Sequence, residues 1–532
     1  MKNISKYLYP AVAGLALVGC NDLDTSPMGN VITEEDRAEV IAKDPSKLEA
    51  TVTGIFGNFY AYAVNVSSNS DFGLPANHII LESRSQDFIS QNPGAYGWFE
   101  APVRFLDNTP TSSYDRQLWG VMYNTIFSAN QVVAICSEDG DDTERFYLAQ
   151  ALGARAYAYW YLAQIYQFNY VGHEQSPCVP LITDKNSEDV AVNGTPRATV
   201  AEIYEQILSD LNSAERCLDG NNMQRTDKRY MDINVIRAVR ARTYLCMQKY
   251  TEAAADAQAV INGGATPVSV AQASIPGFNT ATASNWLWGV VMTENDVHGL
   301  YTFAGFMGSF SYGYAFVGMW KTIASDLFDR IPAGDVRKGW WIDPVTGNSV
   351  ADNYSATFQG MTAREYLLYG VEAPEYAVTK FATYNDQLYQ SINASDVPII
   401  RVEEMYLILA EAQAMGGNLN DGKATLENFV NTYRWTDSAN PYVCSATNAE
   451  SFLDEVWFQR RVELWGEGIA YMDCLRLNKG INRTGATNCD DTFKWNIPAG
   501  SAVLLYQIPQ AEIEGNPALS TADQNPTGSA TL

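Results

Sequence analysis

The chain has 532 residues, of which 46% are hydrophobic, and its 61 acidic residues against 35 basic ones give a formal charge of −26 at pH 7. So acidic a chain repels phosphate backbones and anionic lipid heads, which argues against nucleic acid as a partner. Apart from Cys20, the seven cysteines are widely spaced, odd in number and never in a C-x-x-C pair, so neither a disulfide framework nor a zinc ribbon is expected.

The first twenty residues have the layout of a bacterial secretion signal. Lys2 and Lys6 form a basic start, and residues 7–18 are largely apolar but too few to span a membrane, which takes about 20 residues. The run ends in Leu17-Val18-Gly19-Cys20, which resembles the lipobox of bacterial lipoproteins, where the cysteine becomes the acylated N-terminus. We therefore predict a signal peptide over 1–19 and lipidation at Cys20. The alternative is an ordinary secretory signal with a chance cysteine.

Negative charge follows the predicted anchor directly, in Asn21-Asp22-Leu23-Asp24. Such a stretch resembles the signal that sends lipoproteins of Bacteroides-like bacteria to the outer face of the outer membrane. The plainer interpretation is a solvated tether. We expect residues 20–45 to form an acidic tether and N-terminal extension. Residues 46–532 are expected to form a single domain, because no clean linker divides them.

Helical periodicity marks two parts of this domain, about 118–262 and 398–480. Residues 241–261 and 403–434 each have the pattern of two amphipathic helices around a turn, with small alanines that permit close helix approach. This arrangement resembles a tetratricopeptide-type hairpin. The pattern predicts a mostly α fold built on tetratricopeptide-like helix pairs. Longer helices are predicted over 146–170, over 198–218 with a start near Thr199, and over 451–478.

Two other stretches, about 62–116 and 263–397, lack sustained 3.6-residue periodicity. They are rich in Gly, Ser, Asn, Thr and aromatic residues. We predict that they form loops, short helices and a few short strands packed on the helical scaffold, and that they supply an irregular, loop-rich ligand-binding half. The C-terminal segment around YQIPQ is expected to dock back on the scaffold.

Paired acids are the features closest to a catalytic pattern. Glu403-Glu404 and Glu463/Glu467 could suggest a glycosidase, which needs two carboxylates facing one sugar. Arginines lie at neighbouring helical positions, however, and adjacent helical residues point to different sides, so structural ion pairs are the preferred interpretation. We therefore predict no enzyme activity.

The sequence gives little support for a nucleotide or metal site. The sequence GNLNDGKA (417–424) lacks the final Ser or Thr of a phosphate-binding loop, and no G-x-S-x-G is present. His78, His173 and His298 are too far apart to form a zinc-binding pair. We predict no cofactor and no metal, although loop carboxylates leave no firm pattern and so do not decide about calcium.

Several segments together resemble one family. They occur in the order found in the SusD/RagB family of Bacteroidota outer-membrane nutrient-binding lipoproteins, and the resemblance runs from Cys20 to the C-terminus. Each of the last three is more than ten residues long, which makes a chance match in the right order very rare. The segments are the lipobox start, ATVAEIYEQILSDL, DVPIIRVEEMYLILAEA, QRRVELWGEGIAYMDCLRL and LYQIPQAEIEGNPALSTADQNP.

The resemblance implies a SusD-like fold and a non-catalytic role. It also implies a partner, a TonB-dependent outer-membrane barrel of the SusC/RagA type, over which the lipoprotein sits as a lid. The implied location is the outer membrane, lipid-anchored and facing the cell exterior. The implied cargo is an oligosaccharide, captured and passed on unchanged. Two alternatives remain: the same complex with peptide cargo, or a repeat scaffold that binds only proteins.

Aromatic residues in the irregular stretches are the candidate ligand contacts. A sugar ring has an apolar C–H face, which a flat Trp or Tyr ring can cover. Glycines beside such a ring let the backbone present it at the surface. The family's contacts come from loops of this kind, but those loops vary too much for transfer residue by residue. The candidates are Tyr96 and Trp98 in NPGAYGWFEAP, Tyr312 and Tyr314 in GSFSYGYAF, and Trp320 shortly after.

Overall fold

A computed structural model of the chain describes residues 46–63, 69–92, 96–297 and 299–530. The signal peptide predicted over 1–19, lipidation at Cys20 and the tether over 20–45 concern residues outside these ranges. Within the described ranges, no helix combines the length and apolar character that crossing a membrane requires.

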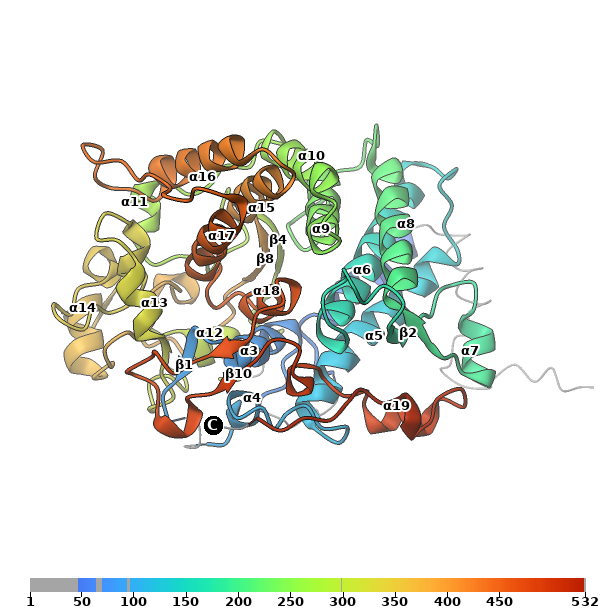
Figure 1. The fold of residues 1–532 in the computed structure, drawn as a ribbon, viewed down its shortest axis with the longest axis horizontal. Coiled ribbons are helices and arrows are strands. Elements are labelled where there is room, and N and C mark those ends of the chain that lie inside the picture. The colour runs from blue at the N-terminus through green and yellow to red at the C-terminus, as the bar shows by residue number, and fades with distance from the viewer. Residues whose placement is uncertain (1–45, 64–68, 93–95, 298, 531–532) are drawn as a thin grey trace, which may run out of the picture.

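The helices of the two periodic parts assemble into one scaffold, and the predicted mostly α fold is confirmed. Its helices are α5 (Ser113–Val133), α6 (Asp142–Tyr166), α8 (Val200–Leu218), α9 (Ile233–Cys246), α10 (Tyr250–Ile261), α15 (Val402–Met415), α16 (Leu419–Tyr433), α17 (Ala449–Glu463) and α18 (Ala470–Arg476). Figure 1 shows them as an arc from α16 through α15, α10 and α9 to α6, α8 and α5. Helices α9 and α10 form one hairpin, α15 and α16 a second, and α10 packs against α15. Segments from both ends of the chain thus share one scaffold.

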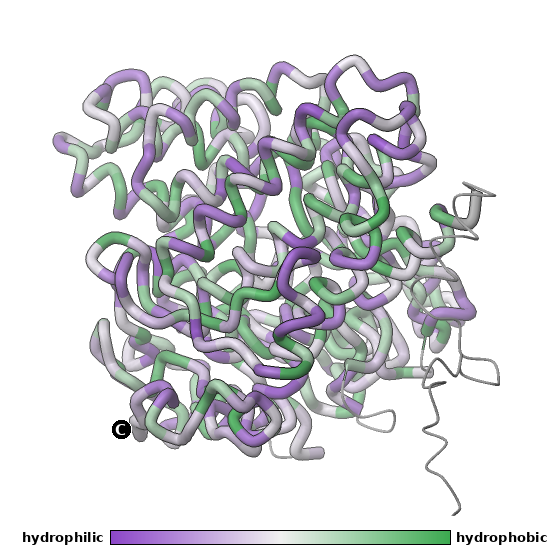
Figure 2. The backbone as a smooth tube through the Cα atoms, turned by 90° about the vertical axis from the view of Figure 1, so that its right-hand side faces the viewer, coloured by the Kyte–Doolittle hydropathy of each residue, from purple (hydrophilic) through white to green (hydrophobic). Residues whose placement is uncertain are grey.

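Local sequence sets the scaffold helices, as α8 illustrates. The Thr199 hydroxyl accepts a hydrogen bond from the Glu202 amide (3.2 Å), and the Glu202 carboxylate accepts one from the Thr199 amide (2.7 Å), which together form a capping box. The predicted start near Thr199 is confirmed. Figure 2 shows hydrophobic and hydrophilic residues alternating along the outer helices, as expected when one face packs on the core. The buried positions of α8 include Val200, Ile203, Tyr204, Ile207 and Leu211.

The other elements of the fold are short strands and mostly short helices, and those within 62–116 and 263–397 agree with the prediction for the stretches without helical periodicity. All strand pairs in the described residues are antiparallel: β1 (Phe88–Ser90) with β5 (Lys321–Ile323), β2 (Pro177–Pro180) with β3 (Arg197–Thr199), β4 (Trp286–Val290) with β8 (Val397–Arg401), β6 (Thr357–Phe358) with β7 (Met361–Thr362), and β9 (Ile481–Asn482) with β10 (Asn496–Ile497). The remaining α-helices are α2 (Ser46–Gly57), α3 (Leu74–Arg84), α4 (Glu100–Val103), α7 (Ser187–Asn193), α11 (Val270–Ala273), α12 (Phe303–Met307), α13 (Ser325–Arg330), α14 (Ala363–Glu365) and α19 (Gln510–Gly515).

Helix α3 is the exception within the predicted irregular stretch 62–116. All of its residues are buried, among them the polar side chains of Asn77, His78 and Glu82. A helix buried on every side has no solvent-facing stripe, so its sequence lacks the 3.6-residue alternation that identifies an amphipathic helix.

The single helix predicted over 451–478 is wrong, because the chain breaks into α17 and α18. Gly466 and Gly468 between them adopt φ values of +81° and +79°, which a helix cannot contain. A Cβ atom at Gly468 would lie 2.7 Å from the His78 ring. The break therefore lets the backbone approach α3 closely.

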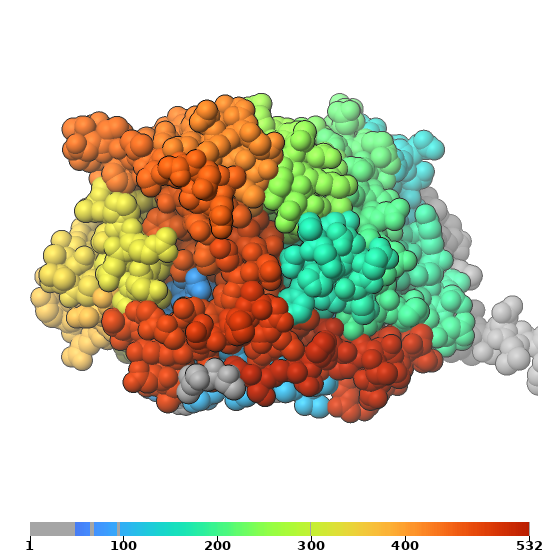
Figure 3. All heavy atoms as spheres, in the orientation of Figure 1, coloured from blue at the N-terminus to red at the C-terminus, as the bar shows by residue number. Residues whose placement is uncertain are grey.

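The C-terminal segment docks on the scaffold, as predicted, and forms a continuous red band along the lower face in Figure 3. The Tyr506 amide donates to the carbonyl of Ile165 (3.1 Å), and Asn525 Nδ2 donates to the carbonyl of Tyr166 (2.8 Å). Both contacts lie at the end of α6.

A buried ionic network joins the scaffold to the irregular half. Glu463, at the end of α17, has no solvent exposure and pairs with Arg434 (2.8 Å), Arg401 (3.1 Å) and Arg337 (3.3 Å). Burial by itself raises a carboxyl pKa, but these arginines hold the pKa of Glu463 well below its usual range. Four cations face four anions, so the charges balance. The members of the network are Arg337, Lys380, Arg401, Arg434, Asp335, Glu403, Glu463 and Glu467.

Glu82 on α3 makes stability depend on pH. Burial raises the pKa of Glu82 to about 8, and only one of its oxygens has a partner among the described residues, the Gly468 amide at 2.8 Å. In the unfolded chain the Glu82 carboxyl has its ordinary pKa of 4.5. The stabilisation due to the protonated carboxyl in the folded chain is therefore complete below pH 4.5 and is lost as the pH rises to 8.

Glu82→Gln, which mimics the protonated form, is therefore expected to gain stability relative to the parent chain by about 3–4 kcal/mol between pH 5 and pH 8. Urea unfolding at several pH values measures this difference. The exposed Glu205→Gln on α8 serves as the control and should show no such trend. Parallel stability–pH curves for the parent and Glu82→Gln chains would refute the assignment.

Candidate functional site

Three of the predicted contact residues meet in one cluster. The rings of Tyr96 and Trp98 stack with centroids 5.0 Å apart and an interplanar angle of 10°, and Trp98 meets Tyr314 edge-on at 4.4 Å. Tyr301 lies parallel to Tyr314 at 5.9 Å. Phe306 closes the base, 4.6 Å from Tyr314 and 6.0 Å from Trp98. We call Tyr96, Trp98, Tyr301 and Tyr314 the aromatic platform.

The platform is open to solvent on one side and anchored on the other. Tyr96 is 48% exposed, Trp98 and Tyr301 are half-buried, and Tyr314 is only 8% exposed. Burial, reinforced by a hydrogen bond with Tyr301, raises the pKa of Tyr314 above its usual value, so its hydroxyl stays protonated. A fixed aromatic surface with hydroxyl groups at its edge can cover the apolar face of a sugar and bond to its polar rim.

Glycines build the platform in two different ways. Gly97 adopts φ +71°, which turns the chain between the rings of Tyr96 and Trp98. Gly313 instead provides close packing, because a Cβ atom there would collide with the backbone of Gly305 on α12. The absence of that atom lets the Tyr314 amide donate to the Gly305 carbonyl (2.6 Å) and places the Tyr314 ring on Phe306.

Sequence reasoning missed Tyr301. It lies two residues after Gly299, which has a φ of +64°, so the glycine beside an aromatic residue that identified the other members was present here as well. Its pairing with Tyr314 depends on the loop between them, residues 302–313, folding back through α12, which no local pattern indicates.

The other two candidates lie elsewhere. Tyr312 packs on Tyr389 (4.8 Å) and Phe316 (5.5 Å) in a second aromatic group. Trp320 is 6% exposed and belongs to a small core cluster around Phe310 and Tyr366. Of the five predicted residues, the structure therefore brings Tyr96, Trp98 and Tyr314 together and separates the others from them.

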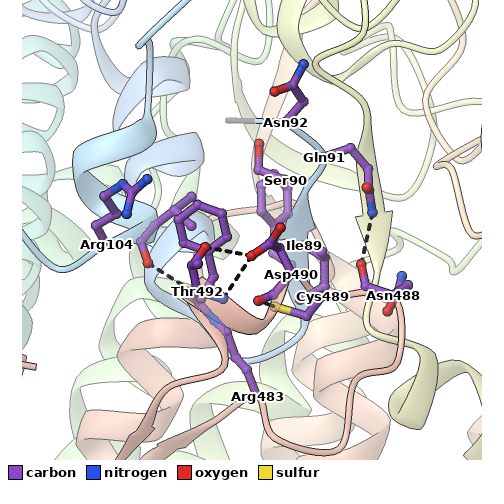
Figure 4. A pocket seen from close by; sticks show the side chains of 13 residues that line it. Ile89, Ser90, Gln91, Asn92, Arg104, Arg483, Asn488, Cys489, Asp490 and Thr492 are labelled. Atoms are coloured by element: carbon purple, nitrogen blue, oxygen red, sulfur yellow. Dashed lines mark hydrogen bonds between the residues drawn. The ribbon is translucent and has the colours of Figure 1, made fainter. Parts of the chain in front are cut away.

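A pocket of about 410 Å³ lies beside β1, within the size range of small-molecule sites. Figure 4 shows Arg104 on one side, Gln91 and Asn488 on the other, Asp490 between them and Arg483 below. The Asp490 carboxylate accepts hydrogen bonds from the amide (2.8 Å) and hydroxyl (2.6 Å) of Thr492.

One chain segment connects the pocket with the platform. Asn92 lines the pocket, Tyr96 and Trp98 belong to the platform, and Val103 and Arg104 line the pocket again. Four residues span at most about 14 Å, so Asn92 and Tyr96 lie within that distance. The pocket and the platform are therefore neighbours along one short segment.

The glutamates considered above as possible catalytic pairs already bind cationic side chains. Glu403 and Glu463 have no solvent exposure and belong to the ionic network, whereas Glu404 accepts a hydrogen bond from Arg242 (2.9 Å). None of these three carboxylates faces an open surface. Among the described residues, no group of three or more His, Cys, Asp and Glu side chains is placed to hold a metal ion.

Two family models match the chain. Residues 46–245 match a model described as "Starch-binding associating with outer membrane", and residues 337–527 match the SusD family. SusD-like protein P2 of Formosa agariphila is 26% identical over 257 residues, which cover 47% of this chain but only 45% of that relative. SusD-like protein P38 of the same organism is 22% identical over 409 residues, covering 71% of this chain and 76% of the relative.

Solved structures share the fold. A SusD-like carbohydrate binding protein from Bacteroides vulgatus superimposes with a TM-score of 0.73 at 20% identity, over 91% of this chain and 98% of that one. A SusD superfamily protein from Bacteroides thetaiotaomicron gives a TM-score of 0.69 at 21% identity, over 91% and 99% of the two chains. At these identities the likeness establishes the fold alone.

Proposed function

Because the chain belongs to the SusD/RagB family, we propose that it binds oligosaccharides on the aromatic platform and delivers them, chemically unchanged, to a partner transporter. The observation that carries this proposal is the platform, in which three of five rings chosen for sugar contact converge with a fourth, Tyr301. Its open side suits capture followed by release. The printed descriptions of a starch-binding family and of a carbohydrate-binding structural neighbour support the same ligand class.

The partner we propose is a TonB-dependent outer-membrane barrel of the SusC/RagA type. The family description of association with the outer membrane supports this location. The lipobox ending at Cys20 and the acidic residues behind it support a lipid-anchored protein that faces the cell exterior. Affinity purification of the full chain from outer membranes should recover such a barrel. A purified chain without any barrel protein would count against the partnership.

A binding screen tests the cargo. The purified chain is incubated with a glycan array and, separately, with peptide mixtures, and hits are measured by calorimetry. We expect binding to at least one oligosaccharide, which is recovered intact after incubation. Binding to peptides only would replace the proposed cargo with the peptide alternative, and cleavage of the bound oligosaccharide would make the protein an enzyme.

A further inference from the structure

The pocket beside β1 has an uncompensated positive charge in its wall. Arg483 is 1% exposed, and its three hydrogen bonds go to the backbone carbonyls of Ser83 (2.6 Å), Ser85 (2.9 Å) and Val103 (3.0 Å). Each of its three nitrogens thus has a carbonyl acceptor, but the carbonyls do not neutralise its charge. No carboxylate in the described part of the chain forms a salt bridge with it, and a buried cation without an anion is costly.

A second cation without a carboxylate partner among the described residues lies behind a residue of the pocket wall. Lys321, on β5, is 1% exposed and sits opposite Ser90 of β1 in the strand register. Its ammonium donates to Ser90 Oγ at 2.8 Å, and no salt bridge joins it to any described carboxylate. Burial lowers the pKa of Lys321 to about 7. Ser90 itself lines the pocket. Its hydroxyl accepts from the lysine and can donate its own hydrogen to a bound group.

Arg104 provides the third cation, at the rim. Its Nε donates to Glu100 (2.7 Å), while its terminal nitrogens form no hydrogen bond with any described residue. The guanidinium lies over the Phe493 ring, 4.7 Å from the centroid. The opposing charge is Asp490, which is exposed and already accepts two hydrogen bonds from Thr492.

The larger cavity on the scaffold shows the contrast. It measures about 590 Å³ and also contains a buried arginine, Arg155. There the guanidinium pairs with Asp184 and Asp210, each at 2.7 Å, so the charge is neutralised within the protein. The pocket beside β1 lacks such partners for Arg483 and Lys321.

We propose that the pocket beside β1 binds the anionic group of an acidic sugar, a carboxylate or a sulfate, while the neighbouring residues of the same oligosaccharide lie on the aromatic platform. This inference rests on the proposed function and specifies its substrate class as acidic glycans. An anionic oxygen group would accept hydrogen bonds from Ser90 and the free Arg104 nitrogens and would supply the counter-charge that Lys321 and Arg483 lack. Asp490 would accept from sugar hydroxyls.

The test compares matched ligands on the full chain. Oligogalacturonate is measured against its methyl ester, and chondroitin sulfate oligosaccharides against their desulfated form, alongside a glycan array of neutral and acidic members. We expect the acidic form of at least one pair to bind at least tenfold more tightly, because hydrogen bonds to charged groups are stronger than neutral ones. The pair that responds identifies the anion as carboxylate or sulfate.

Two variants localise the effect. Lys321→Met removes a buried unpaired charge and should fold, and Arg104→Gln changes a rim residue. Both should reduce the acidic preference about tenfold. The matched control Arg216→Gln removes another exposed arginine with a single carboxylate partner, Glu138, and should leave the preference unchanged. Calorimetry in two buffers near pH 7 should detect proton uptake on binding by the parent chain but not by Lys321→Met, because an incoming anion raises the lysine pKa.

Equal affinity for acidic and neutral forms, binding of neutral glycans only, or an unchanged preference in Lys321→Met would overturn the acidic-sugar inference while leaving platform binding intact. Trp98→Ala distinguishes the two claims, since it should weaken neutral and acidic ligands alike. If no glycan binds at all, the proposed function fails, and this inference fails with it.

Discussion

Glu463→Gln is expected to lower the free energy of unfolding by about 3–5 kcal/mol, the largest stability effect of any substitution considered for this protein. The carboxylate is fully buried and contacts three arginines, Arg337, Arg401 and Arg434. Glutamine keeps the shape but removes the negative charge, so four buried cations would face three anions. The arginines belong to different parts of the chain, and their repulsion would loosen the junction between scaffold and irregular half.

Urea unfolding at pH 7 measures this loss. The matched control is Glu138→Gln, which breaks the exposed pair with Arg216 and should cost no more than about 1 kcal/mol. Because the pKa of Glu463 is depressed in the folded chain, its contribution is present above its ordinary value of 4.5 and is lost as the pH falls through the folded-state pKa. The two chains should therefore converge in stability at acidic pH. A constant difference across that range would show that charge is not the cause.

Trp98→Ala is expected to weaken oligosaccharide binding by at least about 2 kcal/mol, roughly 30-fold. Trp98 contacts every other member of the platform, so its removal takes away the central ring surface and frees Tyr96 and Tyr314 to reorient. Calorimetry with the best ligand from the glycan screen gives the affinity. Circular dichroism and urea unfolding confirm that the variant remains folded.

Trp457→Ala is the matched control for this binding loss. Trp457 is also half-buried, but it lies on scaffold helix α17 and packs under Arg461, 4.7 Å from its ring centroid. It should leave affinity unchanged. A third variant, Tyr312→Ala, probes the second aromatic group and should have little effect. If Tyr312→Ala abolished binding and Trp98→Ala did not, the ligand surface would be the group around Tyr389 instead of the platform.

Features encoded within a few residues were readable from the sequence. The capping box of Thr199 and Glu202 lies within one helical turn, and the hairpins α9–α10 and α15–α16 have apolar faces repeating at helical spacing. The choice of glycine-framed aromatics selected three platform residues. For Tyr96 and Trp98 the cause is local, because the left-handed Gly97 sets the turn between their rings. For Tyr314 the glycine, Gly313, acts through its contact with Gly305 on α12. Where an element is stabilised by contacts between residues three or four apart, the local sequence pattern is sufficient to predict it.

Other features could not be predicted, because buried segments without alternating polar and apolar residues leave no pattern in the sequence. Helix α3 is surrounded by protein on all sides, and Trp320 has loop-like sequence neighbours but packs into a core cluster. Tyr312 and Tyr314 stand two residues apart in one glycine-rich loop and yet join different aromatic groups. The side of the loop that each ring faces is set by its packing partners, which are distant in the sequence.

The sequence by itself determined the helical scaffold and the family, since both depend on local periodicity and on long contiguous motifs. Tertiary structure alone decided which charges are neutralised. Glu463 is matched by arginines 29, 62 and 126 residues away. Arg483 instead lines a pocket, and Lys321 lies behind Ser90 of the same pocket, with no carboxylate paired to either in the described chain. Coulomb attraction depends on the distance between two charges, and the desolvation cost depends on their burial. Neither can be read from the order of the residues in the sequence.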